Sequence, residues 1–199
     1  MDLDFAKGIS LENSRVLIRP LESGDLSLLI DVATADKDLN QFSPVQIYSE
    51  DLLSRYIENA VLERTNKLRY PFIIFDKQIN AYAGSTSFLN ISNRDKRIEI
   101  GATWIGNQFQ RTGLNKHCKF LLMTYAFDHL DFERVELKTD ERNIKSRAAI
   151  EKIGGKLEGI LRSHTVMSDG FRRNTVYYGI LKDEWPHIKQ KLGHKLGLL

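Results

Sequence analysis

The sequence predicts an α+β fold in which a mixed, mostly antiparallel sheet of about seven strands is flanked by four or five helices. Three observations predict it. Segments rich in β-formers follow one another over residues 70–105, which indicates an antiparallel meander. A helical segment then separates two strand-like segments, which is the pattern of a parallel crossover. The last two strands surround Ser168-Asp-Gly170, a strong hairpin turn.

The first third contains one strand and two helices. Residues 15–21 (RVLIRPL) alternate as a short strand, and residues 22–35 carry apolar side chains at helical spacing. Residues 36–48 form an irregular connection. Ser49 is a helix N-cap, because two acidic residues follow it and apolar residues then continue at helical spacing to Val61.

The remaining elements alternate along the chain. Strands are expected over 70–76, 81–92, 97–105, 134–139, 156–168 and 171–181, and helices over 112–129, 143–153 and 185–196. Gly154-Gly155 ends the helix before it. Because no break in composition and no linker interrupts the chain, we expect a single domain over residues 1–199.

Composition excludes several classes of protein. With 42% hydrophobic and 28% charged residues and a net charge of +3, the chain has the composition of an ordinary globular domain, which gives little support to a general nucleic-acid surface. A single cysteine rules out an internal disulfide and fits a reducing compartment. The first residues lack a secretion signal, and no run of 18 apolar residues occurs. We expect a cytoplasmic protein with neither nucleic acid nor a membrane as partner.

The helix expected from residue 112 begins with the wrong sign of charge. Its opening, QRTGLNKHCK, carries Arg111, Lys116 and Lys119, and no acid appears before Asp128. The positive end of a helix dipole prefers anions, so either the basic side chains extend into solvent or an anion binds there. Since neither GxxxxGK[ST] nor a strand-to-helix GxGxxG occurs, the two common nucleotide motifs are excluded. Backbone amides beside Gly113 favour a phosphate-containing ligand.

A second segment, residues 143–155 (NIKSRAAIEKIGG), lies about thirty residues after this glycine loop. Together with the loop and the strand bearing Glu99, it resembles the GNAT superfamily of acyl-CoA N-acyltransferases. The segments RVLIRPL, EIGATWI and NIKSRAAIEKIGG are most similar to the branch that includes the RimJ and RimL ribosomal-protein N-acetyltransferases, whose pattern has a strand like "RVLIRPL", an "EIG..WI" strand and an "N..S...E..G" helix. The resemblance covers about residues 14–184 and leaves 185–199 as a C-terminal helix or tail.

The resemblance implies acetyl-CoA as co-substrate and a site for it. Amides of the loop at Gln110, Gly113 and Asn115 would bind the diphosphate, although Asn115 stands where the family has a small residue. The strand before the loop would pair with the pantetheine arm, Asn143 would meet that arm, and Ser146 would lie near the sulfur. The residues expected to bind acetyl-CoA are Ala102, Thr103, Trp104, Ile105, Gln110, Arg111, Thr112, Gly113, Leu114, Asn115, Lys116, Asn143 and Ser146.

The resemblance also implies Glu99 as the general base, acting through water. From the residues alone, Glu99 could instead face solvent or pair with Arg97 or a neighbouring strand. Many family members place a tyrosine acid seven residues after the helix asparagine, where this chain has Ile150. Ser146 or a bound water is then the candidate proton donor, with a plain polar role in the first helical turn as the alternative for Ser146. Cys118 lies on an apolar helical stripe and is expected to be structural.

The acceptor is expected to be an amine. At pH 7 an α-amine loses its proton for roughly 1 kcal/mol, but a lysine needs roughly 4.6 kcal/mol, which favours a protein N-terminus, a peptide or an amino acid. Residues 36–48 and 164–176 would wall the acceptor cleft, with Phe42, Tyr48, His164 and Arg172 as candidate contacts.

Other functions stay open at this point. The chain could be a non-catalytic acyl-CoA sensor or scaffold, or an acetyltransferase for small-molecule amines or antibiotics. The histidines show no metal-ligand spacing, so no metal is expected. The resemblance is compatible with a homodimer formed through the C-terminal strands.

Overall fold

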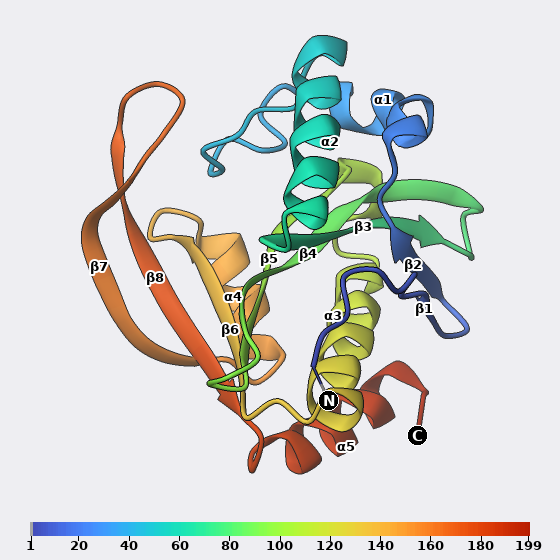
Figure 1. Ribbon diagram of the computed structural model, residues 1–199, viewed down its shortest axis with the longest axis vertical. Coiled ribbons are helices and arrows are strands. Elements are labelled where there is room, and N and C mark those ends of the chain that lie inside the picture. The colour runs from blue at the N-terminus through green and yellow to red at the C-terminus, as the bar shows by residue number, and fades with distance from the viewer. Residues whose placement is uncertain (1) are drawn as a thin grey trace.

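The computed structural model describes residues 2–199, which form one eight-stranded sheet and five α-helices (Figure 1). The strand order is β1-β2-β3-β4-β5-β6-β8-β7, and only β5 and β6 pair in parallel. The strands are β1 (Leu11–Glu12), β2 (Val16–Pro20), β3 (Arg69–Asp76), β4 (Ala81–Ser92), β5 (Arg97–Ile105), β6 (Arg134–Asp140), β7 (Lys156–Val166) and β8 (Arg172–Leu181). The helices are α1 (Leu26–Thr34), α2 (Glu50–Thr65), α3 (Leu114–Thr124), α4 (Ile144–Lys152) and α5 (Trp185–Leu196).

The expected α+β architecture is confirmed, with two local differences. The eighth strand, β1, has only two residues and too little pattern to be recognised in the sequence. The helix expected over 112–129 is α3 followed by a π-helical turn, η3 (Tyr125–His129). None of the helices within residues 2–199 is long and apolar enough to cross a bilayer.

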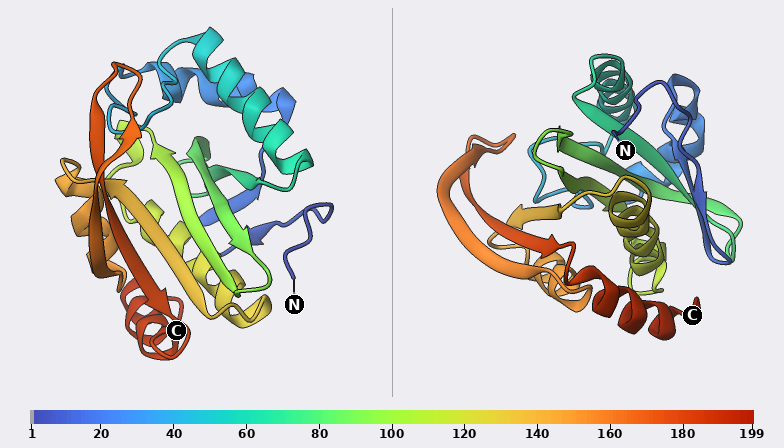
Figure 2. Two further views of the ribbon diagram at one scale, coloured as in Figure 1. Left: turned by 60° about the vertical axis from the view of Figure 1, so that its left-hand side comes forward. Right: turned by 60° about the horizontal axis from the view of Figure 1, so that its bottom comes forward.

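Side chains alternate along the central strands, so helices cover both faces of the sheet. On one face, the Ser85 hydroxyl lies 3.1 Å from the Tyr56 hydroxyl of α2. On the other, Phe88 packs against Phe72 and stacks on Tyr125 beside α3, with ring centroids 5.4 and 6.2 Å apart. These rings are buried or half-buried, and the core is one continuous cluster that includes residues from both faces of the sheet. Figure 2 shows the helices on the two sides of the sheet.

The centre of the sheet is open. Strands β5 and β6 pair only through residues 97–99 and 134–136, and they separate towards their C-terminal ends. Beyond that point residues 100–105 pair on the β4 side alone, and residues 137–140 on the β8 side alone. Helix α3 follows β5 and helix α4 follows β6, so both helices begin at the ends of the strands that have separated.

The irregular segment 36–48 lies beside the hairpin of β7 and β8 at one end of the molecule (Figures 1 and 2). Arg173 of β8 joins the two, because its guanidinium Nη1 donates to the carbonyl of Phe42 at 2.9 Å. Strand β7 forms the edge of the sheet.

Candidate active site

The glycine loop ends at Gly113, the N-cap of α3. Its φ of +94° is a left-handed conformation that favours glycine, while a Cβ there would meet nothing within 4 Å. The N–H groups of Lys116 and His117 donate to the Gly113 carbonyl. Among the described residues no carbonyl accepts from the N–H groups of Gly113 to Asn115, and only that of Leu114 reaches a side chain, the Thr112 hydroxyl at 3.4 Å. The amides of Gly113 and Asn115 are available to an anion at the positive end of the helix.

Side chains of the loop hold its backbone in place. The Gln110 amide donates to the Ile105 carbonyl and to Asn107 Oδ1, both at 3.0 Å, and the Thr112 hydroxyl donates to the Phe109 carbonyl at 2.7 Å. Arg111 is exposed with a φ of +63°, Lys116 is half-buried, and Leu114 is buried in the core. Of the side chains expected to bind acetyl-CoA, only those of Arg111 and Lys116 add positive charge beside the free backbone amides.

The unpaired part of β5 supplies a second backbone surface. Ala102 is an exposed residue with a φ of +47° at a break in the pairing with β4, which is typical of a β-bulge. Thr103 is half-buried, and Trp104 and Ile105 are buried. An extended ligand could therefore pair with the main chain of 100–105 as a further strand would.

Two buried polar atoms in these segments lack partners among residues 2–199, Nε1 of Trp104 and Oδ1 of Asn115. Buried polar groups are nearly always hydrogen-bonded, and exceptions occur at functional sites. Both atoms lie in the segments expected to bind acyl-CoA, so the residues present are compatible with that ligand.

Helix α4 begins on the other side of the opening. Asn143 caps it, since Oδ1 accepts from the Ser146 N–H at 3.0 Å. This bond leaves the Asn143 amide nitrogen as a donor. Ser146 is half-buried in the first turn, and Ile150, one turn further, is buried and has no proton to give.

Glu99 lies on β5 at the last residue that pairs with β6. Its side chain is buried, and Oε2 is fixed by Lys138 Nζ at 2.8 Å and by the Asn90 amide at 2.5 Å. The ion pair with a neighbouring strand, which the sequence left as the alternative to catalysis, is therefore present. Oε1 accepts no hydrogen bond from residues 2–199 and lies 2.9 Å from where a Cβ at Gly101 would stand. One oxygen is held, and the other can accept a proton.

Lys138 keeps a positive charge beside that carboxylate. Burial lowers the pKa of Lys138, but the hydrogen bond and ion pair with Glu99 outweigh burial and raise it above its usual value. The amine also lies 4.6 Å from the centre of the Tyr177 ring. Register explains the pairing, because residue 136 lies opposite Glu99 and residue 138 is the next side chain on that face.

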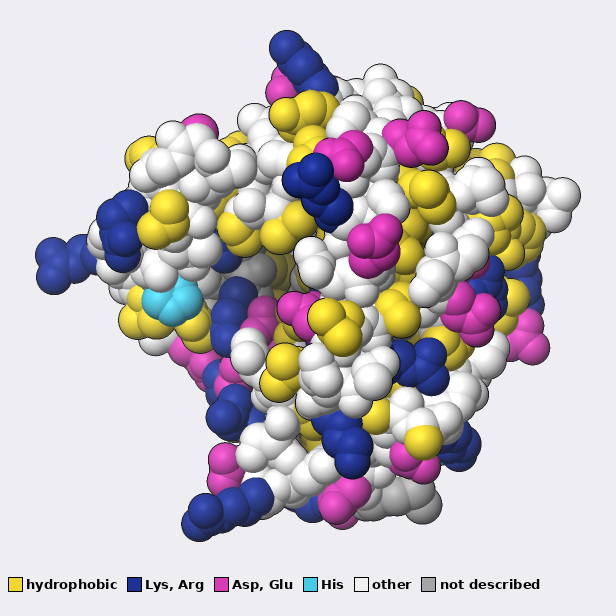
Figure 3. Space-filling view, turned by 45° about the horizontal axis from the view of Figure 1, so that its top comes forward, with side chains coloured by type: hydrophobic (Ala, Val, Ile, Leu, Met, Phe, Trp, Pro, Cys, Tyr) yellow, Lys and Arg dark blue, Asp and Glu magenta, His cyan; other side chains and the backbone are white. Residues whose placement is uncertain are grey.

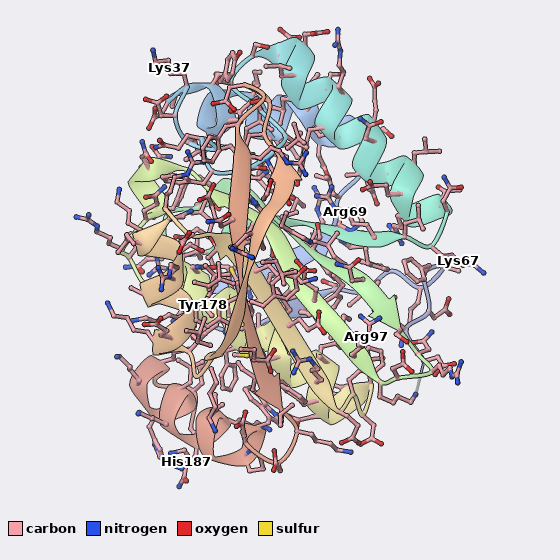
Figure 4. The ribbon with its side chains drawn as sticks, turned by 90° about the vertical axis from the view of Figure 1, so that its left-hand side faces the viewer. Lys37, Lys67, Arg69, Arg97, Tyr178 and His187 are labelled. Carbon is pink, nitrogen blue, oxygen red and sulfur yellow. The ribbon has the colours of Figure 1, made fainter. Side chains whose placement is uncertain are left out.

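A cavity of about 580 Å³ opens between segment 36–48 and the β7–β8 turn. Phe42 and Tyr48 line it, as expected, together with Arg142 and Asp169. An adjoining cavity of about 560 Å³ shares Tyr48 and Asp169. Figure 3 shows this face hollowed, with basic and acidic side chains inside. In Figure 4, Lys37, another lining residue, lies at the end of the molecule away from His187.

The other two expected acceptor contacts do not line either cavity. His164 lies in a hydrogen-bonded group with Thr175 and Tyr177 on the hairpin strands. Arg172 is exposed and bonds to Ser163 across the hairpin. Arg142 and Asp169 at the cavity have no signal in the sequence, because only the folded chain brings the start of α4 to the β7–β8 turn.

Cys118 is fully buried, and burial raises the pKa of its thiol to about 12. A thiol that stays protonated is a poor nucleophile, which fits a structural role. Within residues 2–199 no group of three or more His, Cys, Asp or Glu side chains could hold a metal ion.

Comparisons with known proteins agree with this geometry. The family model described as an acetyltransferase (GNAT) domain matches residues 15–156. The "Putative ribosomal N-acetyltransferase YdaF" of Bacillus subtilis (strain 168) is 36% identical over 102 residues. The match covers 51% of this chain and 55% of YdaF, so the chain spans about half the length of that relative. A crystal structure of a "putative acetyltransferase" from T. thermophilus is 30% identical, with a TM-score of 0.85 over 94% of this chain and 96% of that one.

A third similarity concerns the fold alone. The structure of a "putative ribosomal-protein-serine acetyltransferase" from Vibrio cholerae has a TM-score of 0.76 at 19% identity, and covers 91% of this chain and 99% of that one. The resemblance to the GNAT superfamily is confirmed by the family model, and the ribosomal names are those of YdaF and of the Vibrio protein. The chain belongs to the GNAT acetyltransferase family.

Proposed function

We propose that the protein transfers the acetyl group of acetyl-CoA to a primary amine, with both substrates bound at once. The observation that carries this is the unpaired edge of β5 between the N-termini of α3 and α4. That edge offers backbone partners to a pantetheine arm, and the free amides at Gly113 and Asn115 offer donors to a diphosphate.

Glu99 is the proposed base. The amine nitrogen attacks the thioester carbon, the C–N bond forms, and the C–S bond breaks with its electron pair left on the CoA sulfur. The proton that the amine loses passes through a water to Oε1 of Glu99, while Lys138 and Asn90 hold Oε2. Because the carboxylate is fixed through one oxygen only, its orientation is set without blocking the atom that reacts.

The proposed acceptor is a protein or peptide N-terminal α-amine. Its lower pKa supports this for a site with one carboxylate base, and YdaF carries a ribosomal name. The cavity of about 580 Å³ contains both aromatic side chains and charges of both signs, which suits several residues of a peptide. The whole chain would act as one domain in the cytoplasm, with a homodimer through the C-terminal strands as a compatible assembly.

The test is release of free CoA thiol from acetyl-CoA by the purified protein. Peptides with different N-terminal residues are compared with amino acids, polyamines and aminoglycosides. Turnover with peptides supports the proposed acceptor, and turnover with small amines alone contradicts it. A protein whose melting temperature does not change with acetyl-CoA would remove the basis for the proposed co-substrate site.

A further inference from the structure

Lys119 of α3 carries an amine in an unusual environment. The side chain is 6% exposed, and Nζ donates to the Thr103 hydroxyl at 2.8 Å. No carboxylate within residues 2–199 forms an ion pair with it, in contrast to Lys138. Lysine is almost never fully buried unless it is paired. A buried ammonium without a counter-charge destabilises the fold, so the presence of Lys119 at this position needs a reason other than stability.

The position of the amine gives that explanation. Thr103 belongs to the part of β5 that has separated from β6, so Lys119 contacts the strand segment beside the opening. Lys119 lies on the helix whose N-terminus carries the free amides, less than two turns after Gly113. An ammonium has three donors. Thr103 takes one of them, and no other hydrogen bond to residues 2–199 uses the remaining two.

The electrostatics of the amine suit proton transfer. Burial lowers the pKa of Lys119 to about 8. Cys118 on the same helix and Glu99 on β5 raise this pKa and so oppose part of the effect of burial. Glu99 is itself paired with Lys138, which weakens its hold on the Lys119 proton. An ordinary thiol has a pKa of about 8.5, so a proton can pass from this ammonium to a thiolate at little cost in free energy.

Helix α4 lacks the tyrosine acid that many family members carry there, and Ser146 is the one hydroxyl that it retains. At the position one turn after Ser146 stands Ile150, whose buried side chain cannot release a proton. Cys118 faces the core, and its thiol is a weaker acid than the Lys119 ammonium. Among the side chains around the opening, Lys119 combines a proton, a buried position and unused donors.

We propose that Lys119 faces the sulfur of bound CoA and gives its proton to the departing thiolate. The inference rests on the proposed acetyl transfer. As the C–S bond breaks, the electron pair stays on sulfur, the Lys119 ammonium gives a proton to it, and CoA leaves as the thiol. Lys119 is left as a neutral amine, which solvent protonates again before the next turnover. Thr103, bonded in turn to Thr86 at 2.8 Å, orients the amine.

The test needs no acceptor. CoA itself is bound to the protein, and the pKa of its thiol is measured from the ultraviolet absorbance of the thiolate. The wild type is compared with Lys119→Met and Lys119→Gln, which both remove the charge, while Gln keeps a donor for Thr103. Lys152→Met, at an exposed position on α4, is the matched control.

A cation close to the sulfur should lower the thiol pKa by about one unit or more in the wild type and in Lys152→Met, compared with both Lys119 variants. Equal thiol pKa values in all four proteins would overturn the role of Lys119 and leave acetyl transfer standing. CoA that does not bind to the wild type would overturn the proposed function and this inference with it. With a reactive acceptor, turnover should fall at least about tenfold in both Lys119 variants.

Discussion

Replacing Lys119 by methionine should make the protein more stable at neutral pH. Burial lowers the pKa of Lys119 from 10.5 to about 8. At about 1.36 kcal/mol per unit, the folded state holds this proton with a penalty of up to about 3 kcal/mol relative to the unfolded chain. Methionine has a similar length and no charge, and Thr103 keeps Thr86 as its hydrogen-bond partner.

The sign of the pH dependence follows from the lowered pKa. Below pH 8 both the folded and the unfolded wild type hold the proton, and the whole penalty applies. As the pH rises from 8 to 10.5, the folded state releases the proton first, so the wild type becomes more stable relative to Lys119→Met. Between pH 7 and 9.5 the difference in unfolding free energy should shrink by about 2 kcal/mol.

The assay is denaturant unfolding of both proteins at these two pH values. Burial raises the pKa of Tyr70 and of Tyr125 in the folded protein, but both tyrosines are present in both chains, so their contributions cancel in the comparison. A difference that stays constant with pH would refute a lowered pKa. A methionine variant less stable than the wild type at pH 7 would show that Lys119 is a structural cation.

Three further changes test the site and the fold. Glu99→Gln should lower the transfer rate by about a hundredfold or more, because a base acts on the amine and not on CoA binding. Calorimetry should show an unchanged affinity for acetyl-CoA. An equal loss of transfer rate and of affinity would argue against a base. Gly101→Ala places a Cβ 2.9 Å from Glu99 Oε1 and from Leu89 Cδ1, so turnover should fall at least about tenfold. The control Gly159→Ala, whose Cβ meets nothing within 4 Å, should leave turnover unchanged. Equal rates for the two variants would show that Oε1 is not the reacting atom. Ser49→Ala removes the cap that accepts from the Leu52 N–H and should cost about 1 kcal/mol of unfolding free energy, measured by urea unfolding, and no loss would mean that solvent replaces the cap.

Most of the fold could be predicted because its elements are marked locally. The N-cap at Ser49, the glycines after α4 and the turn before β8 each give a helix or strand boundary in the sequence. The two-residue β1 carries no such mark, because it depends on pairing with β2. The π-helical turn after α3 likewise has no signal in a pattern of apolar residues that suits an α-helix throughout.

The site could be predicted only in part, for a physical reason. The glycine loop is a local feature and is visible as a motif. The partner of Glu99 depends on the register between β5 and β6, and the cavity lining depends on the approach of segment 36–48 to a hairpin more than a hundred residues later. Lys119 looked like part of a basic helix start, and only burial distinguishes it from the exposed Arg111.

The separation of β5 from β6 has a consequence for how such a protein can diverge. Main-chain groups at 100–105 are the same whichever side chains they carry, so substitutions there leave intact the unpaired edge that we propose pairs with the ligand. Only a proline, which lacks the N–H, or an insertion that shifts the register would remove it. The walls formed by segment 36–48 and the β7–β8 turn are free of that constraint. The site for the acyl donor can therefore stay the same while the site for the acceptor changes, although one sheet carries both sites.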